Sequence, residues 1–271
     1  MNLKLMYITN EPETAKAAQE AGIDRVFIDL ELNGKYERQG HLDTHITTHK
    51  IDDINKVRKV LDKSDLLVRV NPIYKSTKDE INRVIEYGAD VIMLPMFKND
   101  REVERFINLV NGRAKTCLLL ETAQALVRID DILEIDGIDE IHIGLNDLHI
   151  SMGLDSMFEL LSGGILDYLS EKIKKKGICF GFGGIAKIGT GVIPANMILA
   201  EHYRLKSESV ILSRAFRNNL NDVSVQGTIL KNEIEKIRNK EYEYKKWTKD
   251  DFEINRIELK KIIKQLNYTL T

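Results

Sequence analysis

Apolar and polar positions follow two alternating patterns along the chain. Segments such as 76–87 and 99–110 gather their apolar residues on one helical face, as Ile81, Val84 and Ile85 do in the first of them. Short runs between such segments are apolar almost throughout, which is typical of parallel strands covered on both faces. The pattern therefore predicts helices that alternate with parallel strands.

Glycines mark the passage from each helical segment to the next strand. Gly22, Gly88, Gly137 and Gly177 each follow a helical pattern and precede a short apolar run. Glycine is favoured there because the residue after a helix often takes a left-handed conformation. The intervals between these glycines differ, so the chain is not a solenoid of fixed period.

We expect eight strands and at least seven helices before residue 220. The predicted strands are residues 3–8, 25–30, 65–70, 91–95, 115–121, 139–144, 178–182 and 208–212. The predicted helices are residues 11–21, 51–62, 76–87, 99–110, 123–129 with a continuation at 131–135, 157–176 and 194–203. This order predicts an α/β protein, a (β/α)8 TIM barrel. The alternative is a doubly wound open sheet, which usually has a glycine-rich loop after its first strand, where this chain reads "ITNEPET".

The composition changes after about residue 220, where Lys and Glu become frequent. Two helices are expected there, with apolar stripes formed by Ile229, Leu230, Ile234 and Ile237 and by Ile254, Ile257, Ile262 and Leu266. We therefore divide the chain into a catalytic barrel, residues 1–220, and a C-terminal helical extension, residues 221–271. The extension is either a helical hairpin packed on the barrel or an arm that binds a neighbouring subunit.

Overall composition limits the classes of partner. The chain has 271 residues, 43% of them hydrophobic and 30% charged, with a net charge of −2, so a general affinity for nucleic acid is not expected. It contains neither a signal-like N-terminus nor an apolar run of about 18 residues, so no membrane contact is expected. Cys117 and Cys179 lie in apolar runs and are interpreted as buried, reduced thiols, in keeping with a cytoplasmic location.

The predicted strand ends carry most of the chemistry. In a barrel of this kind, functional residues lie at the carboxyl ends of the strands. The residues there are Asp29, Glu31, Arg69, Asn71, Pro95, Glu121, Asn146, Asp147, Ser213 and Arg214. Four carboxylates beside one guanidinium would raise one another's pKa values, and a divalent cation would relieve that repulsion.

Glu121 and Asp147 are the predicted metal ligands, because they end adjacent strands. Two carboxylates with room for water favour a hard cation such as Mg²⁺, with Mn²⁺ or Co²⁺ as substitutes. The alternative is that Glu121 only favours a helix N-terminus and Asp147 only caps the next helix. Arg69 is predicted to bind the carboxylate or enolate oxygen of a 2-oxo acid, with a simple ion pair as the alternative.

Five segments in sequence resemble the HpcH/HpaI aldolase and citrate lyase β-subunit family of phosphoenolpyruvate/pyruvate-binding barrels. They read "VFIDLE", "LLVRVNP", "GADVIMLPM", "LLLETAQAL" and "GIDEIHIGLNDLHISMG", within a match that runs from about residue 20 to 215. The resemblance implies a divalent metal at Glu121 and Asp147 and contact between Arg69 and the bound 2-oxo acid.

The resemblance has further implications for the site and the assembly. Backbone amides of Gly144, Leu145 and Asn146 would hold the substrate carboxylate, and Asp29 and Glu31 would support the residues that contact metal and substrate. The family makes or breaks C–C bonds through a pyruvate enolate. It commonly forms trimers or hexamers that exchange C-terminal helices.

The chain departs from the family at its second strand. Hydroxy-acid aldolases continue this motif as Asp-Gly-Glu-His, with a histidine that assists proton transfer, and here Leu32 takes that position. The following loop contains His41, His45 and His49. We expect His41 to take over proton transfer. The alternatives are that these are surface histidines or that, at spacing four, they line a helix as transition-metal ligands.

Two further departures concern the second substrate. His149 stands where the family usually has a small residue, which would reshape the aldehyde pocket. Lys35 and Arg38 lie in the loop where CoA phosphates would bind, but they form no clear phosphate site.

Together these features predict a metal-dependent aldolase or lyase acting on a 4-hydroxy-2-oxo acid or a related substrate, with a 2-oxo acid and an aldehyde as partners. One alternative is an acyl-CoA lyase of the citrate lyase β-subunit type or a phosphonate-type rearrangement. Another is a non-catalytic 2-oxo-acid-binding barrel, which the replacement by Leu32 would favour.

Overall fold

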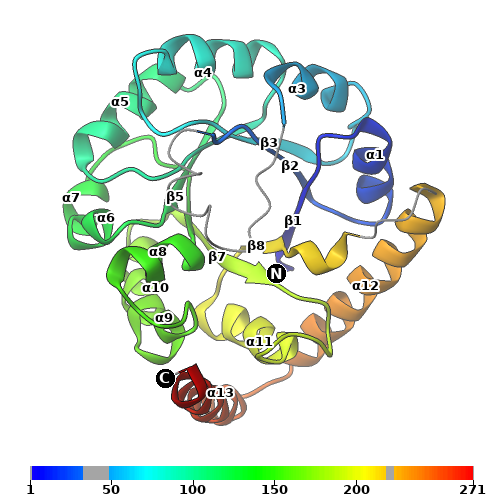
Figure 1. The fold of residues 1–271 in the computed structure, drawn as a ribbon, viewed down its shortest axis with the longest axis vertical. Helices are drawn as coiled ribbons and strands as arrows, with labels where there is room; N and C mark the ends of the chain where they lie inside the picture. The colour runs from blue at the N-terminus through cyan, green and yellow to red at the C-terminus, as the bar shows by residue number, and fades with distance from the viewer. Residues whose placement is uncertain (1, 33–48, 218–222, 271) are drawn as a thin grey trace.

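A computed structural model describes residues 2–32, 49–217 and 223–270 of the chain. Eight parallel strands pair in sequence order, and β8 returns to β1, so the sheet is a closed barrel (Figure 1). The strands are β1 Lys4–Ile8, β2 Arg25–Asp29, β3 Asp65–Arg69, β4 Val91–Leu94, β5 Lys115–Leu120, β6 Glu140–Ile143, β7 Cys179–Ile185 and β8 Ser209–Leu212. The predicted TIM barrel is confirmed, and the open-sheet alternative is wrong.

Helices surround this barrel as an outer ring (Figure 1). The described helices are α1 Pro12–Glu20, α3 Ile51–Arg58, α4 Thr77–Glu86, α5 Asp100–Val110, α6 Ala123–Val127, α7 Ile129–Ile132, α8 Leu145–Met152, α9 Glu159–Ser162, α10 Ile165–Lys175, α11 Ala195–Leu205, the 3-10 turn η1 Arg214–Phe216, α12 Val223–Tyr244 and α13 Lys249–Leu270. Within the described ranges, none of them has both the length and the apolar character that a bilayer-spanning helix requires.

Two parts of the helix prediction need correction. The helix expected at 157–176 is two helices, α9 and α10, because Gly164 adopts a left-handed φ of +81° between them. The run after β6, which was not among the predicted helices, forms α8. At Gly22 the prediction is confirmed, since its φ is +98° where α1 turns into β2.

The amino end of the barrel is closed by an ion pair. Arg25 at the start of β2 donates from Nη1 and Nη2 to both carboxylate oxygens of Glu140 at the start of β6, at 2.7 and 2.9 Å. Both side chains are buried. Cys117 lies buried in the barrel interior, whereas Cys179 is only partly buried, which corrects the expectation for that thiol.

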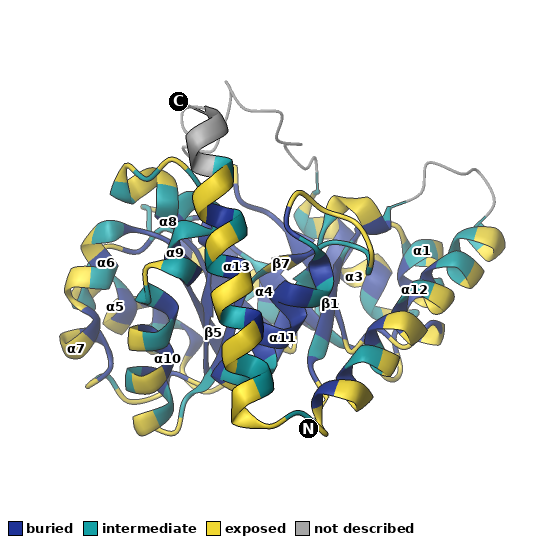
Figure 2. Cartoon of the chain, turned by 90° about the horizontal axis from the view of Figure 1, so that it is seen from below, coloured by how far each residue is buried: buried dark blue, intermediate teal, exposed yellow. Residues whose placement is uncertain are grey.

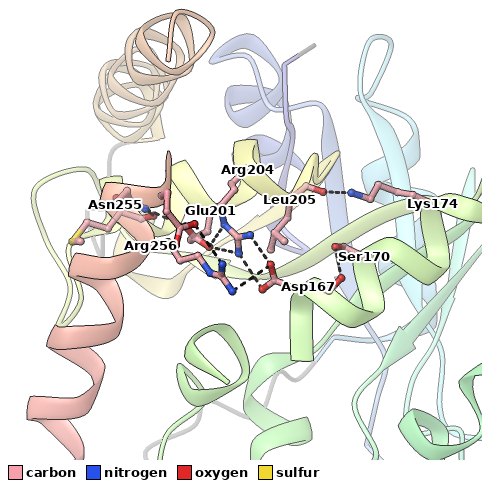
Figure 3. Close-up of polar contacts among 10 residues, drawn as sticks. Asp167, Ser170, Lys174, Glu201, Arg204, Leu205, Asn255 and Arg256 are labelled. Atoms are coloured by element: carbon pink, nitrogen blue, oxygen red, sulfur yellow. Dashed lines mark hydrogen bonds and ion pairs between the residues drawn. The ribbon is translucent and has the colours of Figure 1, made fainter. Parts of the chain in front are cut away.

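The C-terminal helix is anchored to the outside of the barrel by a polar network (Figure 3). Asn255 of α13 donates to Glu201 of α11 at 3.2 Å. Arg204 pairs with Glu201 at 2.7 Å and with Asp167 of α10 at 2.6 Å. Arg256 completes the cluster at 3.9 Å from Asp167. The network therefore joins three helices that lie far apart in sequence.

This anchoring corrects the apolar stripe predicted for the last helix. Leu259 and Ile263 are buried, as is Asn255, whereas Ile254 and Ile257 of the predicted stripe are 57% and 46% exposed; Ile262 and Leu266 are partly buried and pack against the core. Figure 2 shows both exposed and buried residues along α13. The buried face thus combines apolar side chains with the hydrogen-bonded amide of Asn255. The helix α13 packs on α11 and α9 of its own chain, and binding of the extension to a neighbouring subunit stays a prediction.

Candidate active site

The carboxyl ends of the strands bring together the charged residues singled out in the sequence. Asp29 and Arg69 are register partners in β2 and β3. Glu121 directly follows β5, and Gly144, which follows β6, donates its backbone N–H to Leu120 O at 3.0 Å. Asp147 lies three residues further on, in the first turn of α8. All four side chains therefore belong to one rim of the barrel.

Arg69 is held by two acidic side chains. Its Nε and Nη2 each donate to Asp29 at 2.8 Å, and Nη1 lies 3.3 Å from Glu31. Burial alone would lower the pKa of the guanidinium, but the charges of Asp29 and Glu31 raise it above its ordinary value. The ion-pair interpretation of Arg69 is thus correct, and the pair also fixes the plane of the guanidinium fork.

Glu121 is a deeply buried carboxyl at this rim. It is 2% exposed, and burial raises its pKa well above the usual carboxyl range. Arg69 opposes this shift, whereas Asp147 and Glu31 add to it by repulsion. A buried carboxyl surrounded by other acids favours either a proton or a cation.

One oxygen of Glu121 is fixed by the backbone of the neighbouring strand end. Met96, just after β4, donates its N–H to Glu121 Oε1 at 3.1 Å. Its φ is +54°, which is uncommon for a residue with a side chain and aims the amide at the carboxylate. Met96 was not among the predicted site residues, because neither its hydrogen bond nor its φ has a signature in the sequence.

The other oxygen of Glu121 faces Gly144. A Cβ atom at Gly144 would lie only 2.7 Å from Glu121 Oε2, so this position has no room for a side chain. The φ of Gly144 is −80°, which any residue can adopt. Its glycine is therefore explained by the space that the carboxylate needs.

The helix α8 presents its amino end to the same rim. Gly144 is its N-cap, so the expectation that Asp147 caps this helix is wrong. Thr122 caps α6, and its hydroxyl accepts from Ala125 N at 3.1 Å, so Glu121 lies one residue before the cap and the alternative that it favours this helix end stays open.

The amide of Gly144 was expected to hold the substrate carboxylate, but its N–H donates to Leu120 O in the sheet, so that expectation is corrected. The first N–H groups of a helix have no intrahelical acceptor, so the amides of Leu145 and Asn146 suit a carboxylate.

These residues fit a hard divalent cation. The described residues contain no group of three or more His, Cys, Asp or Glu side chains placed to hold a metal. Glu121 and Asp147 would therefore supply two protein ligands, and water or substrate oxygens would complete the shell, as is common for Mg²⁺. The raised pKa of Glu121 and the absence of a side chain at Gly144 both agree with such a ligand.

The predicted proton-transfer residue lies outside the described part of the chain. His41 and His45, with Lys35 and Arg38, fall within residues 33–48, which the structure does not describe. His49 is described, and its Nδ1 accepts from Asp29 N at 3.0 Å. It thus lies at the strand end where the family histidine was expected.

Two other residues of the prediction lie near the rim. Leu32 is 54% exposed, and its backbone N–H donates to Asn71 Oδ1 at 2.9 Å. His149 lies in the second turn of α8, partly buried, with Nδ1 3.3 Å from Leu145 O. Its effect on an aldehyde pocket stays a prediction.

Comparison with known proteins supports the sequence resemblance. The family model described as HpcH/HpaI aldolase/citrate lyase matches residues 4–168. No curated protein sequence matches the chain.

Solved structures share the fold at low sequence identity. An HpcH/HpaI aldolase from Desulfitobacterium hafniense DCB-2 is 13% identical, with a TM-score of 0.60 over 88% of this chain and 93% of that one. An HpcH/HpaI aldolase/citrate lyase family protein from Burkholderia cenocepacia J2315 is 14% identical, with a TM-score of 0.62 over 88% and 95%. The citrate synthase SbnG is 16% identical, with a TM-score of 0.60 over 88% and 94%. Because the family model covers more than half of the chain, this protein belongs to the HpcH/HpaI aldolase/citrate lyase family.

Proposed function

We propose that the protein is a divalent-metal-dependent lyase that makes or breaks a C–C bond through the enolate of pyruvate. The observation that carries this proposal is the meeting of Glu121, Asp147 and Arg69 at one rim, with a raised pKa at Glu121. A bound Mg²⁺ or Mn²⁺ would polarise the 2-oxo group and neutralise developing charge.

Residues of the chain would bind the cation, stabilise the developing charge and bind the substrate carboxylate. Glu121 and Asp147 would hold the cation. Arg69, with its plane fixed by Asp29 and Glu31, would donate to an oxygen of the substrate as it gains charge. The amides of Leu145 and Asn146, at the positive end of α8, would bind the substrate carboxylate.

Proton transfer to and from the substrate needs a group with a pKa near neutrality, which favours a histidine. We assign it to the loop after β2 and keep His41 as the first choice. In His49, Nδ1 accepts from the amide of Asp29, so the neutral ring carries its proton on Nε2. The His41→Ala and His49→Ala variants distinguish the two assignments.

The reaction in the direction of synthesis joins the enolate carbon to the carbonyl carbon of an aldehyde, giving a 4-hydroxy-2-oxo acid. The reverse reaction cleaves that acid to pyruvate and the aldehyde.

Exchange of the pyruvate methyl protons with deuterium tests the proposal without knowledge of the acceptor. We expect exchange that requires the protein and Mg²⁺ or Mn²⁺, that stops with a chelator, and that is lost in Arg69→Lys. A rate equal to that of buffer with metal would contradict the proposal. A screen of aldehydes with pyruvate, read by product mass, then identifies the acceptor.

A further inference from the structure

A further buried carboxylate lies near the carboxyl ends of β2 and β3, outside the proposed metal site. Glu80 on α4 is 9% exposed. It accepts from Asn71 Nδ2 at 2.7 Å, and its two oxygens lie 3.3 and 3.4 Å from Asn71 N. Burying a charged group costs free energy unless hydrogen bonds compensate, so these contacts explain why the carboxylate is tolerated here.

Asn71 connects Glu80 to the loop after β2. While its Nδ2 donates to Glu80, its Oδ1 accepts from Leu32 N at 2.9 Å. Both ends of the side-chain amide are thereby assigned, because only Oδ1 can accept and only Nδ2 can donate. Asn71 is thus a bridge between α4 and the loop.

The bridge replaces a missing backbone contact at the end of the sheet. The last described backbone bond between the two segments runs from Leu30 N to Arg69 O at 2.9 Å. In a regular parallel ladder the next two bonds would run from Asn71 N to Leu30 O and from Leu32 N to the carbonyl of residue 71, but Asn71 N instead faces Glu80. The side chain of Asn71 takes the place of that carbonyl, so the segment from Asp29 to Leu32 is held at both ends.

This segment carries the two acids that hold the guanidinium. Asp29 is the last residue of β2, but Glu31 lies beyond the strand and is only 2% exposed. Its position 3.3 Å from Arg69 Nη1 depends on how the loop is held. A loop released at Leu32 would let Glu31 move and the Arg69 fork tilt.

We propose that Glu80 is a positioning residue that acts through Asn71 to fix Glu31 and Arg69, an inference that rests on the proposed function of Arg69. A displacement of about 1 Å in a group that contacts substrate is enough to reduce a rate by about a hundredfold.

Exchanging the two polar groups tests this directly. Asn71→Asp alone sets two carboxylates against each other and removes the donor to Glu80. Combining it with Glu80→Gln restores a hydrogen bond between the two side chains, with the donor now at position 80. The new amide at position 80 donates to the carboxylate at position 71, and the other oxygen of that carboxylate still accepts from Leu32 N. The net charge of the pair is the same in the double variant as in the wild type.

A matched control makes the same change, from asparagine to aspartate, at a position on α4 that does not contact Asn71 or Glu80. Asn82→Asp lies beside Arg113, whose Nη2 donates to Asn82 Oδ1 at 2.9 Å. We expect it to behave as the wild type in all the measurements below.

Two readouts are needed. Amide hydrogen exchange of a peptide covering residues 28–32 reports the hydrogen bond of Leu32, and deuterium exchange of pyruvate with Mn²⁺ reports turnover and KM. In Asn71→Asp we expect faster amide exchange and a fall in kcat of about ten- to a hundredfold. The double variant should return to within about threefold of the wild type in both readouts, because the hydrogen-bond pattern is restored.

The outcomes separate this inference from the proposed function. Equal amide protection in all variants, or a double variant as impaired as Asn71→Asp, would overturn the role of Glu80. Wild-type protein that shows no metal-stimulated exchange of pyruvate would overturn the proposed function, and with it the part assigned to Arg69. In that case amide exchange still decides whether Glu80 holds the loop.

Discussion

At the scale of single residues, the site depends on how tightly Glu121 is enclosed. One oxygen accepts from the amide of Met96, and the other lies where a side chain at Gly144 would be. Asp147 and Glu31 repel the carboxylate, and Arg69 attracts it. The carboxylate therefore has little freedom to move away from a cation, which is the property of a preorganised ligand.

Adding one methyl group at Gly144 should damage this ligand without unfolding the chain. Gly144→Ala places a Cβ 2.7 Å from Glu121 Oε2, while its φ of −80° suits alanine. We expect Mn²⁺ affinity to fall by about tenfold or more, measured by titration calorimetry. Gly227→Ala, which adds a methyl group beside Ala17 on the outside of the barrel, is the control. Unchanged affinity in Gly144→Ala would show that Glu121 Oε2 is not a ligand.

At the scale of helices and strands, the strand ends were the most predictable part of the site. Each apolar run ends where its charged residue begins, so Asp29, Arg69 and Glu121 could be placed at one rim from the sequence. The contacts of Met96 and Glu80 could not, because they join residues from separate strands and helices and have no local pattern.

The last helix shows why an apolar stripe is an incomplete guide. Ile254 and Ile257 were expected to face the barrel and are exposed, whereas Leu259 and Ile263 are buried. Asn255, which donates to Glu201 of α11, lies on the buried face. The buried face thus includes a polar residue whose partner lies on another helix, and a stripe of apolar positions does not include such a residue.

The polar anchor of α13 should be measurable as stability. Asn255→Ala removes hydrogen bonds to Met197 O and to Glu201 Oε1, both at 3.2 Å. We expect the free energy of unfolding to fall by about 1–3 kcal/mol in urea titrations, because buried acceptors lose their donor. Ile254→Ala, at a neighbouring exposed position, should change it by less than about 0.5 kcal/mol. Equal effects of the two substitutions would mean that Asn255 is no anchor.

At the scale of the whole molecule, the barrel has chemically different ends. The ion pair of Arg25 with Glu140 closes the amino end, where the charges balance. The carboxyl end gathers Asp29, Glu31, Glu121 and Asp147 around Arg69, which leaves an excess of negative charge. The carboxyl end therefore favours the binding of a cation, and an anionic substrate would be attracted there only once that charge is neutralised.

Buried histidines should make the fold sensitive to acid. His142 lies inside the barrel, donates from Nε2 to Gly183 O at 3.1 Å in its neutral form, and has a pKa lowered by burial to about 4. Burial also lowers the pKa of His202. A depressed histidine pKa contributes stability that is present above the unfolded pKa near 6.5 and is lost as pH falls towards the folded value.

The free energy of unfolding should therefore fall between about pH 6.5 and pH 4, with His142 alone contributing a loss of about 2 kcal/mol at pH 5. Urea titrations at pH 7 and pH 5 measure this. His142→Gln, which keeps a donor for Gly183 O, should lose correspondingly less stability on acidification. A slope unchanged from the wild type would show that His142 does not titrate as described.

The fold was thus predictable from its regular α/β alternation, and so was the gathering of charged residues at one rim, whereas metal binding by Glu121 and Asp147 and the choice of proton-transfer group stay predictions. His41 was chosen from three histidines at equal spacing, which the sequence does not rank, and residues 33–48 lie outside the described structure. His49 shows that the first residue after that segment returns to Asp29. A long loop without an apolar face gives the sequence little means to specify which histidine returns.

Metal titration of three proteins tests the central claim most directly. Mn²⁺ is titrated into the wild type, Glu121→Gln and Asp147→Asn, and circular dichroism checks that each variant keeps the fold. We expect one tight site per chain in the wild type and affinity at least about tenfold weaker in each variant, because each loses one anionic ligand. Binding of equal strength in all three proteins would show that these two carboxylates do not share a cation.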